Sequence, residues 1–288
     1  MKKTSLLRQY ILEKSILVMP GAHDTLTARI VEQAGFKAVT IGGYSASASI
    51  LGKPDLSFLT LTEMVDCVSR IVDVTTIPLF ADGDTGYGGV LNVRCTVKKL
   101  EKAGAAGMFI EDQVFPKRCG HMLDKQVIEK QEMIAKVKAA VDARIDNDFI
   151  IMARTDALAV NGIEDAIERG NLYAQAGADL IFVEAPTTIE QMQMITARID
   201  APLLANNIEG GKSPLLSAAE LEKIGYNTVV FPVAATYAVA KVVGGLMAEL
   251  AANGTTAGFN RQMVSFDEFN DLVDLEQLRS LERNYFQT

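Results

Sequence analysis

Residues 148–184 decide the fold, because they hold two apolar runs, DFIIMAR (148–154) and ADLIFVE (178–184), on either side of a helical pattern, IERGNLYAQAG (167–177). The helical part ends in Ala-Gly, a pair that suits the end of a helix. Both flanking runs are continuously apolar rather than alternating, which is typical of parallel strands buried on both faces. The stretch therefore predicts a strand–helix–strand unit of a parallel sheet.

The same unit recurs along the chain. Six further runs of strand length are ILVMP (16–20), KAVTIGG (37–43), IPLFAD (77–82), GMFIED (107–112), APLLAN (201–206) and NTVVFP (227–232). Helical segments between them end in glycine at positions 35, 104, 177 and 225. Eight such units predict an α/β fold of the (β/α)₈ barrel type rather than an open doubly wound sheet. The sequence also lacks the glycine-rich fingerprints of nucleotide-binding folds.

Two regions are expected. Residues 1–254 would form the barrel, and residues 255–288 would form a C-terminal helical extension after a break rich in Gly and Thr. An amphipathic segment beyond a completed barrel needs a surface to cover it. We expect this extension to lie at a subunit contact; the alternative is a helix folded back on its own barrel.

Composition excludes several classes of protein. The chain has 28 Lys and Arg against 36 Asp and Glu, a net charge of −8, which argues against nucleic-acid and anionic membrane partners. With 49% hydrophobic and 22% charged residues, it resembles soluble globular proteins. Three cysteines and two histidines without a C-x-x-C pair argue against structural zinc and favour a reducing compartment. No signal peptide and no apolar window of membrane-spanning length are recognised, so a cytoplasmic location is expected.

Polar residues gather where the predicted strands end, which is where barrel enzymes place their active sites. They are Asp82, Asp84, Glu111, Asp112, Arg154, Asp156, Glu184, Asn206 and Glu209. So many acids in one place would repel one another unless a divalent cation or a hydrogen-bond network offset their charge. The segment ADGDTGYGG (81–89) supplies two hard oxygen ligands and no histidine, which suits Mg²⁺ or Mn²⁺. The alternative is a glycine-rich turn with Asx caps.

A long polar loop, EDQVFPKRCGHMLDKQ (111–126), follows the fourth predicted strand. Cys119 is flanked there by Lys117, Arg118 and His121, neighbours that favour a lowered thiol pKa. Gly120 would allow the loop to act as a lid. The alternative is a surface loop with an incidental cysteine.

Taken together, PGAHD, ADGDTGYG, IEDQ, PKRCGH, ARTDA, FVEAP and NNIEGGKSP resemble the isocitrate lyase / phosphoenolpyruvate mutase superfamily over almost the whole chain. PKRCGH looks like the catalytic loop of its carbon–carbon lyase branch. The resemblance implies a (β/α)₈ barrel whose last helix is exchanged between subunits, a homotetramer built as a dimer of dimers, and bound Mg²⁺, with Mn²⁺ as a possible substitute.

The resemblance also implies a role for individual residues. Asp82 and Asp84 match the principal metal-site acids, and Asp55 and Glu111 match acids that reach the metal largely through water. Two sets of residues match substrate-binding positions. Gly42, Gly43 and Tyr44 match the segment that holds the α-keto acid portion of the substrate. Arg154, Glu184 and Asn206 match groups that bind substrate oxygens. Cys119 matches the general acid, with Lys117, Arg118 and His121 as its setting. Tyr44, Glu111 or a hydroxide on the metal would take the hydroxyl proton.

The implied reaction splits a 2-hydroxy dicarboxylate into a keto acid and a shorter carboxylate. Tyr237 and Phe266 stand where 2-methylisocitrate lyases carry arginines for a third carboxylate, which favours a smaller substrate. NNIEGGKSP resembles the 2,3-dimethylmalate lyase / oxaloacetate hydrolase subgroup. We therefore expect cleavage of 2,3-dimethylmalate, or a similar 2-alkylmalate, to pyruvate and a short carboxylate such as propionate. The alternatives are a 2-methylisocitrate lyase, an oxaloacetate hydrolase or decarboxylase, a phosphonomutase-type enzyme, and a barrel without catalytic activity.

Overall fold

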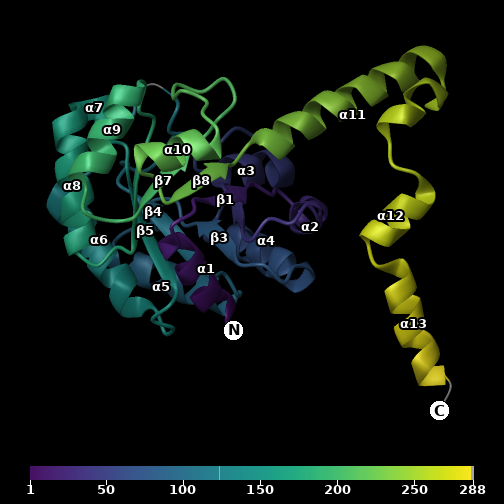
Figure 1. Cartoon of the computed structure of the whole chain (residues 1–288), viewed down its shortest axis with the longest axis horizontal. Coiled ribbons are helices and arrows are strands. Elements are labelled where there is room, and N and C mark those ends of the chain that lie inside the picture. Colours follow the sequence, from purple (N-terminus) through teal and green to yellow (C-terminus); the bar gives the residue numbers. More distant parts are fainter. Residues whose placement is uncertain (123, 287–288) are drawn as a thin grey trace. The chain divides into compact units, whose positions relative to one another are not determined.

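A single sheet of eight parallel strands runs in the order β1-β8-β7-β6-β5-β4-β3-β2 (Figure 1). The computed structural model describes residues 1–122 and 124–286. β1 and β8 are paired, and β1 and β2 are joined by one parallel bridge between Gly21 and Thr40. The sheet is therefore a nearly closed barrel, which confirms the predicted (β/α)₈ fold.

Each strand corresponds to one of the eight predicted apolar runs. The strands are β1 Leu17–Pro20, β2 Val39–Ile41, β3 Leu79–Asp82, β4 Gly107–Glu111, β5 Ile150–Thr155, β6 Leu180–Val183, β7 Leu203–Asn206 and β8 Thr228–Phe231. The four glycines predicted to end helices all have positive φ, between 87° and 114°, as the left-handed end of a helix requires.

Helices connect the strands. Those before β8 are α1 Lys3–Leu12, α2 Thr25–Gln33, α3 Gly43–Leu51, α4 Leu61–Val74, α5 Val90–Lys102, α6 Lys130–Ala143, α7 Ala157–Asn161, α8 Ile163–Gln175, α9 Ile189–Arg198 and α10 Ala218–Ile224. Several begin with capping boxes. The side chains of Thr60 before α4 and Ser217 before α10 accept the backbone N–H groups of Glu63 and Glu220, whose carboxylates accept the backbone N–H groups of Thr60 and Ser217 in return.

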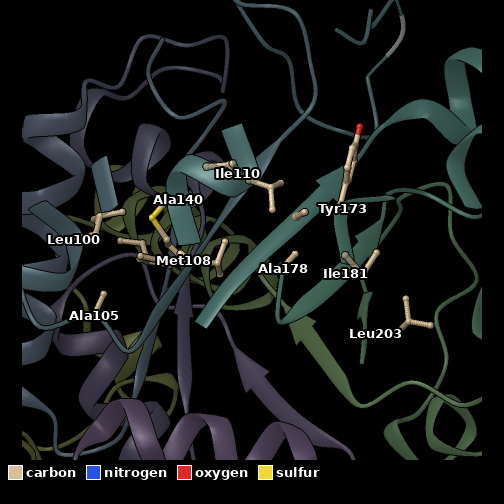
Figure 2. Close-up of a cluster of buried hydrophobic side chains, with 14 of the residues drawn as sticks. Leu100, Ala105, Met108, Ile110, Ala140, Tyr173, Ala178, Ile181 and Leu203 are labelled. Atoms are coloured by element: carbon tan, nitrogen blue, oxygen red, sulfur yellow. The ribbon is translucent and has the colours of Figure 1, made fainter. Parts of the chain in front are cut away.

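The core has two layers because successive strand residues point to opposite faces. Outward-facing residues such as Met108, Ile110 and Ile181 pack against Leu100 and Tyr173 of the surrounding helices (Figure 2). Inward-facing residues form a second buried cluster inside the barrel.

α1 covers the amino-terminal end of the barrel. Its Leu7 and Ile11 are buried in the inner cluster. Its polar side chains bond to the segments that precede β5 and β6, and Arg8 contacts Asp179 at 2.9 Å. The opposite end, where the strands terminate, is left for the polar residues.

The chain divides into two compact units, Met1–Ala234 and Ala235–Thr288. The second unit contains almost all of α11 Ala234–Asn253, followed by η1 Ala257–Gln262, α12 Phe266–Leu272 and α13 Leu275–Phe286. α11 has no buried residue and is long and apolar enough, by length and composition alone, to cross a membrane. The predicted division at residues 254 and 255 stays a prediction, as does the exchange of a helix between subunits.

Candidate active site

Strand periodicity brings the polar residues together above the inner core. The inward-facing apolar layer includes Phe80, Phe109, Met152, Phe182 and Leu204. Two residues further along the same strands are Asp82, Glu111, Arg154, Glu184 and Asn206. Because side chains two residues apart share a face of a strand, these polar groups line the mouth of the barrel directly above an apolar layer.

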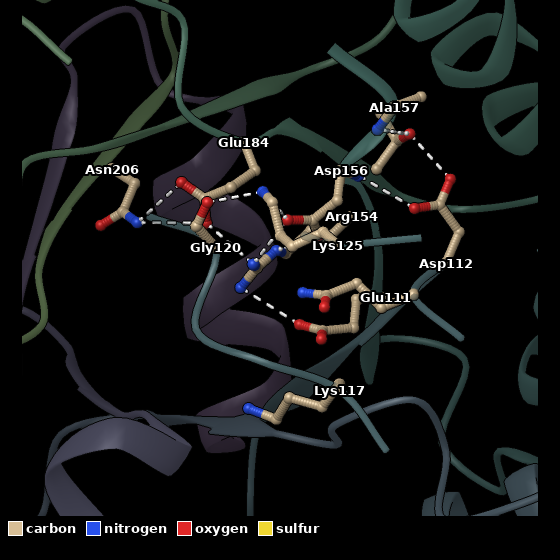
Figure 3. Close-up of polar contacts among 12 residues, drawn as sticks. Glu111, Asp112, Lys117, Gly120, Lys125, Arg154, Asp156, Ala157, Glu184 and Asn206 are labelled. Carbon is tan, nitrogen blue, oxygen red and sulfur yellow. Dashed lines mark hydrogen bonds and ion pairs between the residues drawn. The ribbon is translucent and has the colours of Figure 1, made fainter. Parts of the chain in front are cut away.

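Arg154 is the centre of this group (Figure 3). Its Nη1 lies 3.1 Å from Oε2 of Glu111, and its Nη2 lies 3.1 Å from Oε2 of Glu184. Asp156 accepts two further bonds from its Nε and Nη2, at 2.9 and 3.1 Å. Burial alone would lower the pKa of Arg154, but the three carboxylates raise it well above its ordinary value.

The pKa values of the two glutamates beside Arg154 are shifted in opposite directions. Burial raises the pKa of Glu111 well above its ordinary value, against the opposing effect of Arg154. For Glu184 burial acts in the same direction, but Arg154 and His121 lower its pKa to about 2. Among the described residues, Oε1 of the fully buried Glu111 has no hydrogen-bond or ion-pair partner, whereas Oε2 is paired with Arg154. Glu111 therefore keeps lone pairs for another group.

Lys117 lies among the acids proposed to hold the metal. Its Nζ donates to Oδ2 of Asp55 at 2.7 Å and lies 3.5 Å from Oδ2 of Asp84. Burial alone would lower the pKa of Lys117, but Glu111 and the aspartates raise it well above its ordinary value. Asp82 accepts the N–H of Gly43 and the N–H of Asp84, both at 2.7 Å.

The described residues suit a metal ion that is largely hydrated. Among them, no group of three or more His, Cys, Asp or Glu side chains could hold an ion alone. Oε1 of Glu111 and the buried Asp82 still offer the hard donors that Mg²⁺ prefers, with water completing its shell. β3 ends at Asp82, and Asp84 lies in the next turn with a φ of 53°. The turn after β3, rather than the strand itself, therefore places the second carboxylate.

The prediction of a lowered pKa for Cys119 is wrong. Burial raises the pKa of this thiol, although a backbone hydrogen bond at His121 acts in the opposite direction. The neighbouring cations have other partners: Lys117 pairs with Asp55, and the half-exposed Arg118 faces Asp124 at 3.8 Å. Cys119 is thus held as a protonated thiol, the form that can donate a proton.

His121 joins the Cys119 loop to the strand ends. Its Nε2 lies 3.1 Å from Oε1 of Glu184, and its Nδ1 accepts the N–H of Lys212 at 2.9 Å. In the neutral ring the proton would then be on Nε2, facing Glu184. Gly211 allows this approach, because a Cβ there would lie 2.8 Å from Nδ1 of His121. The loop is folded onto the barrel mouth.

The remaining predicted residues border the same mouth. α3 begins at Gly43, and Gly42 and Tyr44 on either side of it are half-buried. Nδ2 of Asn206 lies 3.4 and 3.5 Å from the oxygens of Glu184. The structure thus brings the predicted residues together except for the side chain of Arg118, which is 48% exposed.

The model of the phosphoenolpyruvate phosphomutase family matches residues 7–251. The chain belongs to this family. Its curated relatives include 2,3-dimethylmalate lyase of Eubacterium barkeri, which is 48% identical over 99% of both chains. A chloroplastic carboxyvinyl-carboxyphosphonate phosphorylmutase of Arabidopsis thaliana is 46% identical over 95% of this chain and 82% of the relative. A 2-methylisocitrate lyase of Aeropyrum pernix is 41% identical over 93% and 86%.

Solved structures of the same family are similar throughout. A crystal structure of 2,3-dimethylmalate lyase superposes with a TM-score of 0.94 at 32% identity, covering 99% of this chain and 96% of the other. An oxaloacetate acetylhydrolase with the inhibitor 3,3-difluorooxalacetate has a TM-score of 0.93, 32% identity and coverage of 99% and 97%. A phosphonopyruvate hydrolase with oxalate and Mg²⁺ has a TM-score of 0.90, 29% identity and coverage of 99% and 100%.

One buried residue of the site, Lys125, was not identified from the sequence. It is buried and donates to Oδ1 of Asp156 at 2.6 Å. Asp156 and Asp112 were noted at the strand ends without a role, and both are fully buried. A lysine in a polar loop is usually exposed to solvent. The burial of Lys125 follows from its contact with Asp156, which lies 31 positions away in the sequence.

Proposed function

We propose that this protein is a Mg²⁺-dependent lyase that cleaves 2,3-dimethylmalate or a similar 2-alkylmalate into pyruvate and a short carboxylate such as propionate. The observation that carries the proposal is the folding of the Cys119 loop onto Arg154 and Glu184, at a mouth lined by Asp82 and Glu111. A dimethylmalate lyase that is 48% identical over 99% of both chains supports the same substrate class.

The substrate's dianion would enter a mouth whose acids are already partly balanced by Arg154 and Lys117. Arg154 would bind a carboxylate through its guanidinium. The Gly42–Tyr44 segment and the amide of Asn206 would orient the remaining oxygens. The apolar layer formed by Phe80 and its neighbours keeps water out of the barrel below, which strengthens these interactions.

Asp82 and Asp84 would hold the ion, with Asp55 and Glu111 reaching it largely through water. When bound, Mg²⁺ would supply Lewis-acid stabilisation of negative charge on substrate oxygens. Phosphonopyruvate hydrolase, which is similar in structure, is described with Mg²⁺ and oxalate.

Bond cleavage needs a proton acceptor and a proton donor. The C2 hydroxyl gives up its proton, the C2–C3 bond breaks as its electron pair moves to the departing fragment, and C2 becomes the carbonyl of pyruvate. Glu111, whose Oε1 has no partner among the described residues, would be the acceptor, and Tyr44 and a hydroxide on the metal are the alternatives. The other fragment leaves as an enediolate, and Cys119 donates the proton to its carbon. The raised pKa of Cys119 suits that role.

The test is a panel of 2-alkylmalates, methylisocitrate and oxaloacetate with Mg²⁺, followed by keto-acid release. We expect 2,3-dimethylmalate to give the highest kcat/KM. Greater turnover of methylisocitrate than of every dicarboxylate would contradict the proposal. EDTA should abolish release, and added Mg²⁺ should restore it and raise the Tm.

Oxaloacetate hydrolysis is the second candidate. The observation that favours it is the structural similarity to oxaloacetate acetylhydrolase, with a TM-score of 0.93. Water would attack the keto carbon in that reaction, the C2–C3 bond would break, and the departing fragment would take up a proton at carbon, so that oxalate and acetate are formed. Detection of oxalate by chromatography separates the two reactions.

The apolar α11 is proposed to be covered by another copy of the chain in a cytoplasmic homotetramer with an exchanged helix. Val239, Val243 and Met247 are between 46% and 49% exposed. Lys241 and Glu249 interrupt the apolar sequence of this helix, and a charged side chain would cost about 2.5–3.5 kcal/mol at the centre of a bilayer. Light scattering of the purified chain without detergent tests this assembly, and a detergent requirement would contradict it.

A further inference from the structure

Lys125 ties the loop that carries Cys119 to the centre of the site. Its Nζ donates to the carbonyl oxygen of Gly120 at 2.5 Å and to Oδ1 of Asp156 at 2.6 Å (Figure 3). The Lys125 side chain is 2% exposed, so both bonds are protected from water. A single ammonium thus links the loop backbone to the carboxylate that holds Arg154.

Asp156 is a fixed anchor for this link. Its side chain is 0% exposed, and its two oxygens also accept from Nε and Nη2 of Arg154. Its backbone N–H donates to Oδ1 of Asp112 at 2.9 Å. Asp112 is itself held from behind, since Arg169 and Tyr173 of α8 donate to its Oδ2 at 3.1 and 2.8 Å. The anchor therefore belongs to the barrel rather than to the loop.

Gly120 is held from its other side as well. A Cβ at this position would lie 2.3 Å from Nη2 of Arg154 and 2.5 Å from Cδ of Glu184. The loop backbone consequently rests directly on the Arg154–Glu184 pair, while its carbonyl is bound by Lys125. Cys119 and His121 flank Gly120, so their positions depend on where its backbone is held.

We propose that Lys125 is a positioning residue that holds the Cys119–His121 segment over Arg154 by bridging the Gly120 carbonyl and Asp156. The inference rests on the proposed function, in which Cys119 donates the proton. Lys125 contacts the loop and its anchor and acts on the reaction through them. Loss of this bridge would displace the proton donor and leave the groups that bind the substrate in place. A displacement of about 1 Å can lower turnover about 100-fold.

The test replaces Lys125 by methionine, which keeps the length and removes the charge and the donor. All variants carry Cys95→Ser, because Cys95 is exposed and Cys67 is buried, so that iodoacetamide reports on Cys119. We expect Lys125→Met to lower kcat about 100-fold with KM changed less than about threefold. Alkylation of Cys119 should become about tenfold faster, as loss of a charge-assisted hydrogen bond predicts. Lys130→Met, which removes a lysine paired with Asp165 and Glu168, should change neither rate more than about twofold.

Lys125→Arg is a second variant, which keeps the test decisive if Lys125→Met does not fold. It retains the charge beside Asp156, so we expect a native Tm with turnover and alkylation between those of the wild type and Lys125→Met. Wild-type alkylation in a folded Lys125→Met variant, or in Lys125→Arg if the former does not fold, would overturn the inference. A kcat within threefold of the wild type in an active enzyme would do the same. Alkylation of Cys119 needs no substrate. If the wild type shows no lyase activity, the proposed function is refuted, and the alkylation rates still test whether Lys125 positions the loop.

Discussion

Nζ of Lys117 lies 2.7 Å from Oδ2 of Asp55, and both side chains are almost completely buried. Asp55 precedes β3 in the sequence, whereas Lys117 follows β4. The pair places a cation within the acidic cluster before any metal binds. Removing one partner of a buried ion pair leaves a charge without compensation, which is more costly than losing an exposed pair.

Lys117→Met should therefore destabilise the metal-free protein by about 3–5 kcal/mol, because Asp55 and Asp84 lose their counter-charge. Saturating Mg²⁺ should recover part of this loss by supplying positive charge nearby. Urea unfolding with EDTA and with Mg²⁺ measures both values. The control is Lys130→Met, whose lysine is more exposed. Equal destabilisation with and without Mg²⁺ would argue against a metal beside Lys117.

Gly120→Ala should lower turnover about 100-fold, because the new Cβ would lie 2.3 Å from Nη2 of Arg154 and displace the loop. Its Tm should stay close to that of the wild type, since a loop can move without exposing the core. Steady-state kinetics and calorimetry check the two expectations. Gly89→Ala is the matched control, because a Cβ there meets nothing within 4 Å. Full activity of Gly120→Ala would show that the loop position is unimportant for turnover.

Cys119→Ser should lower lyase turnover by about 10²–10⁴-fold, the contribution of a positioned proton donor, while substrate binding is retained. Single-turnover kinetics and calorimetric titration separate the two effects. Cys95→Ser, an exposed change, should be silent. Full activity of Cys119→Ser would contradict the assignment of Cys119 as the proton donor.

Asp165 should contribute to acid sensitivity. Partial burial would raise its pKa, but hydrogen bonds from Lys130, Asn161 and Arg169 lower it to about 2. A pKa lowered by folding adds stability above the unfolded value of about 3.8, and this contribution disappears as the pH falls toward 2. Asp165→Asn should therefore be less stable than the wild type at pH 6, with the difference shrinking at pH 3. Urea unfolding at several pH values measures it, and Glu168→Gln is the control. A difference that grows on acidification would contradict the assignment.

Short-range patterns in the sequence predicted the fold and most of the site. Strand-length apolar runs located all eight strands, and the residues that close them, such as Glu111 and Arg154, do line one mouth. The setting of Cys119 could not be read in this way. Lys117, two positions away in sequence, pairs with Asp55 of another segment, and burial then determines the thiol pKa. The link from Lys125 to Asp156 likewise depends on contacts that form only when the barrel closes.

The inner layer of Phe80, Phe109, Met152, Phe182 and Leu204, with Leu7 and Ile11 of α1 beneath it, leaves the barrel without a passage through its centre. A substrate bound above this layer would enter, and both of its fragments would leave, at the carboxyl ends of the strands, where the Cys119 loop lies. The packing that stabilises the fold thereby closes the opposite end of the barrel to the substrate.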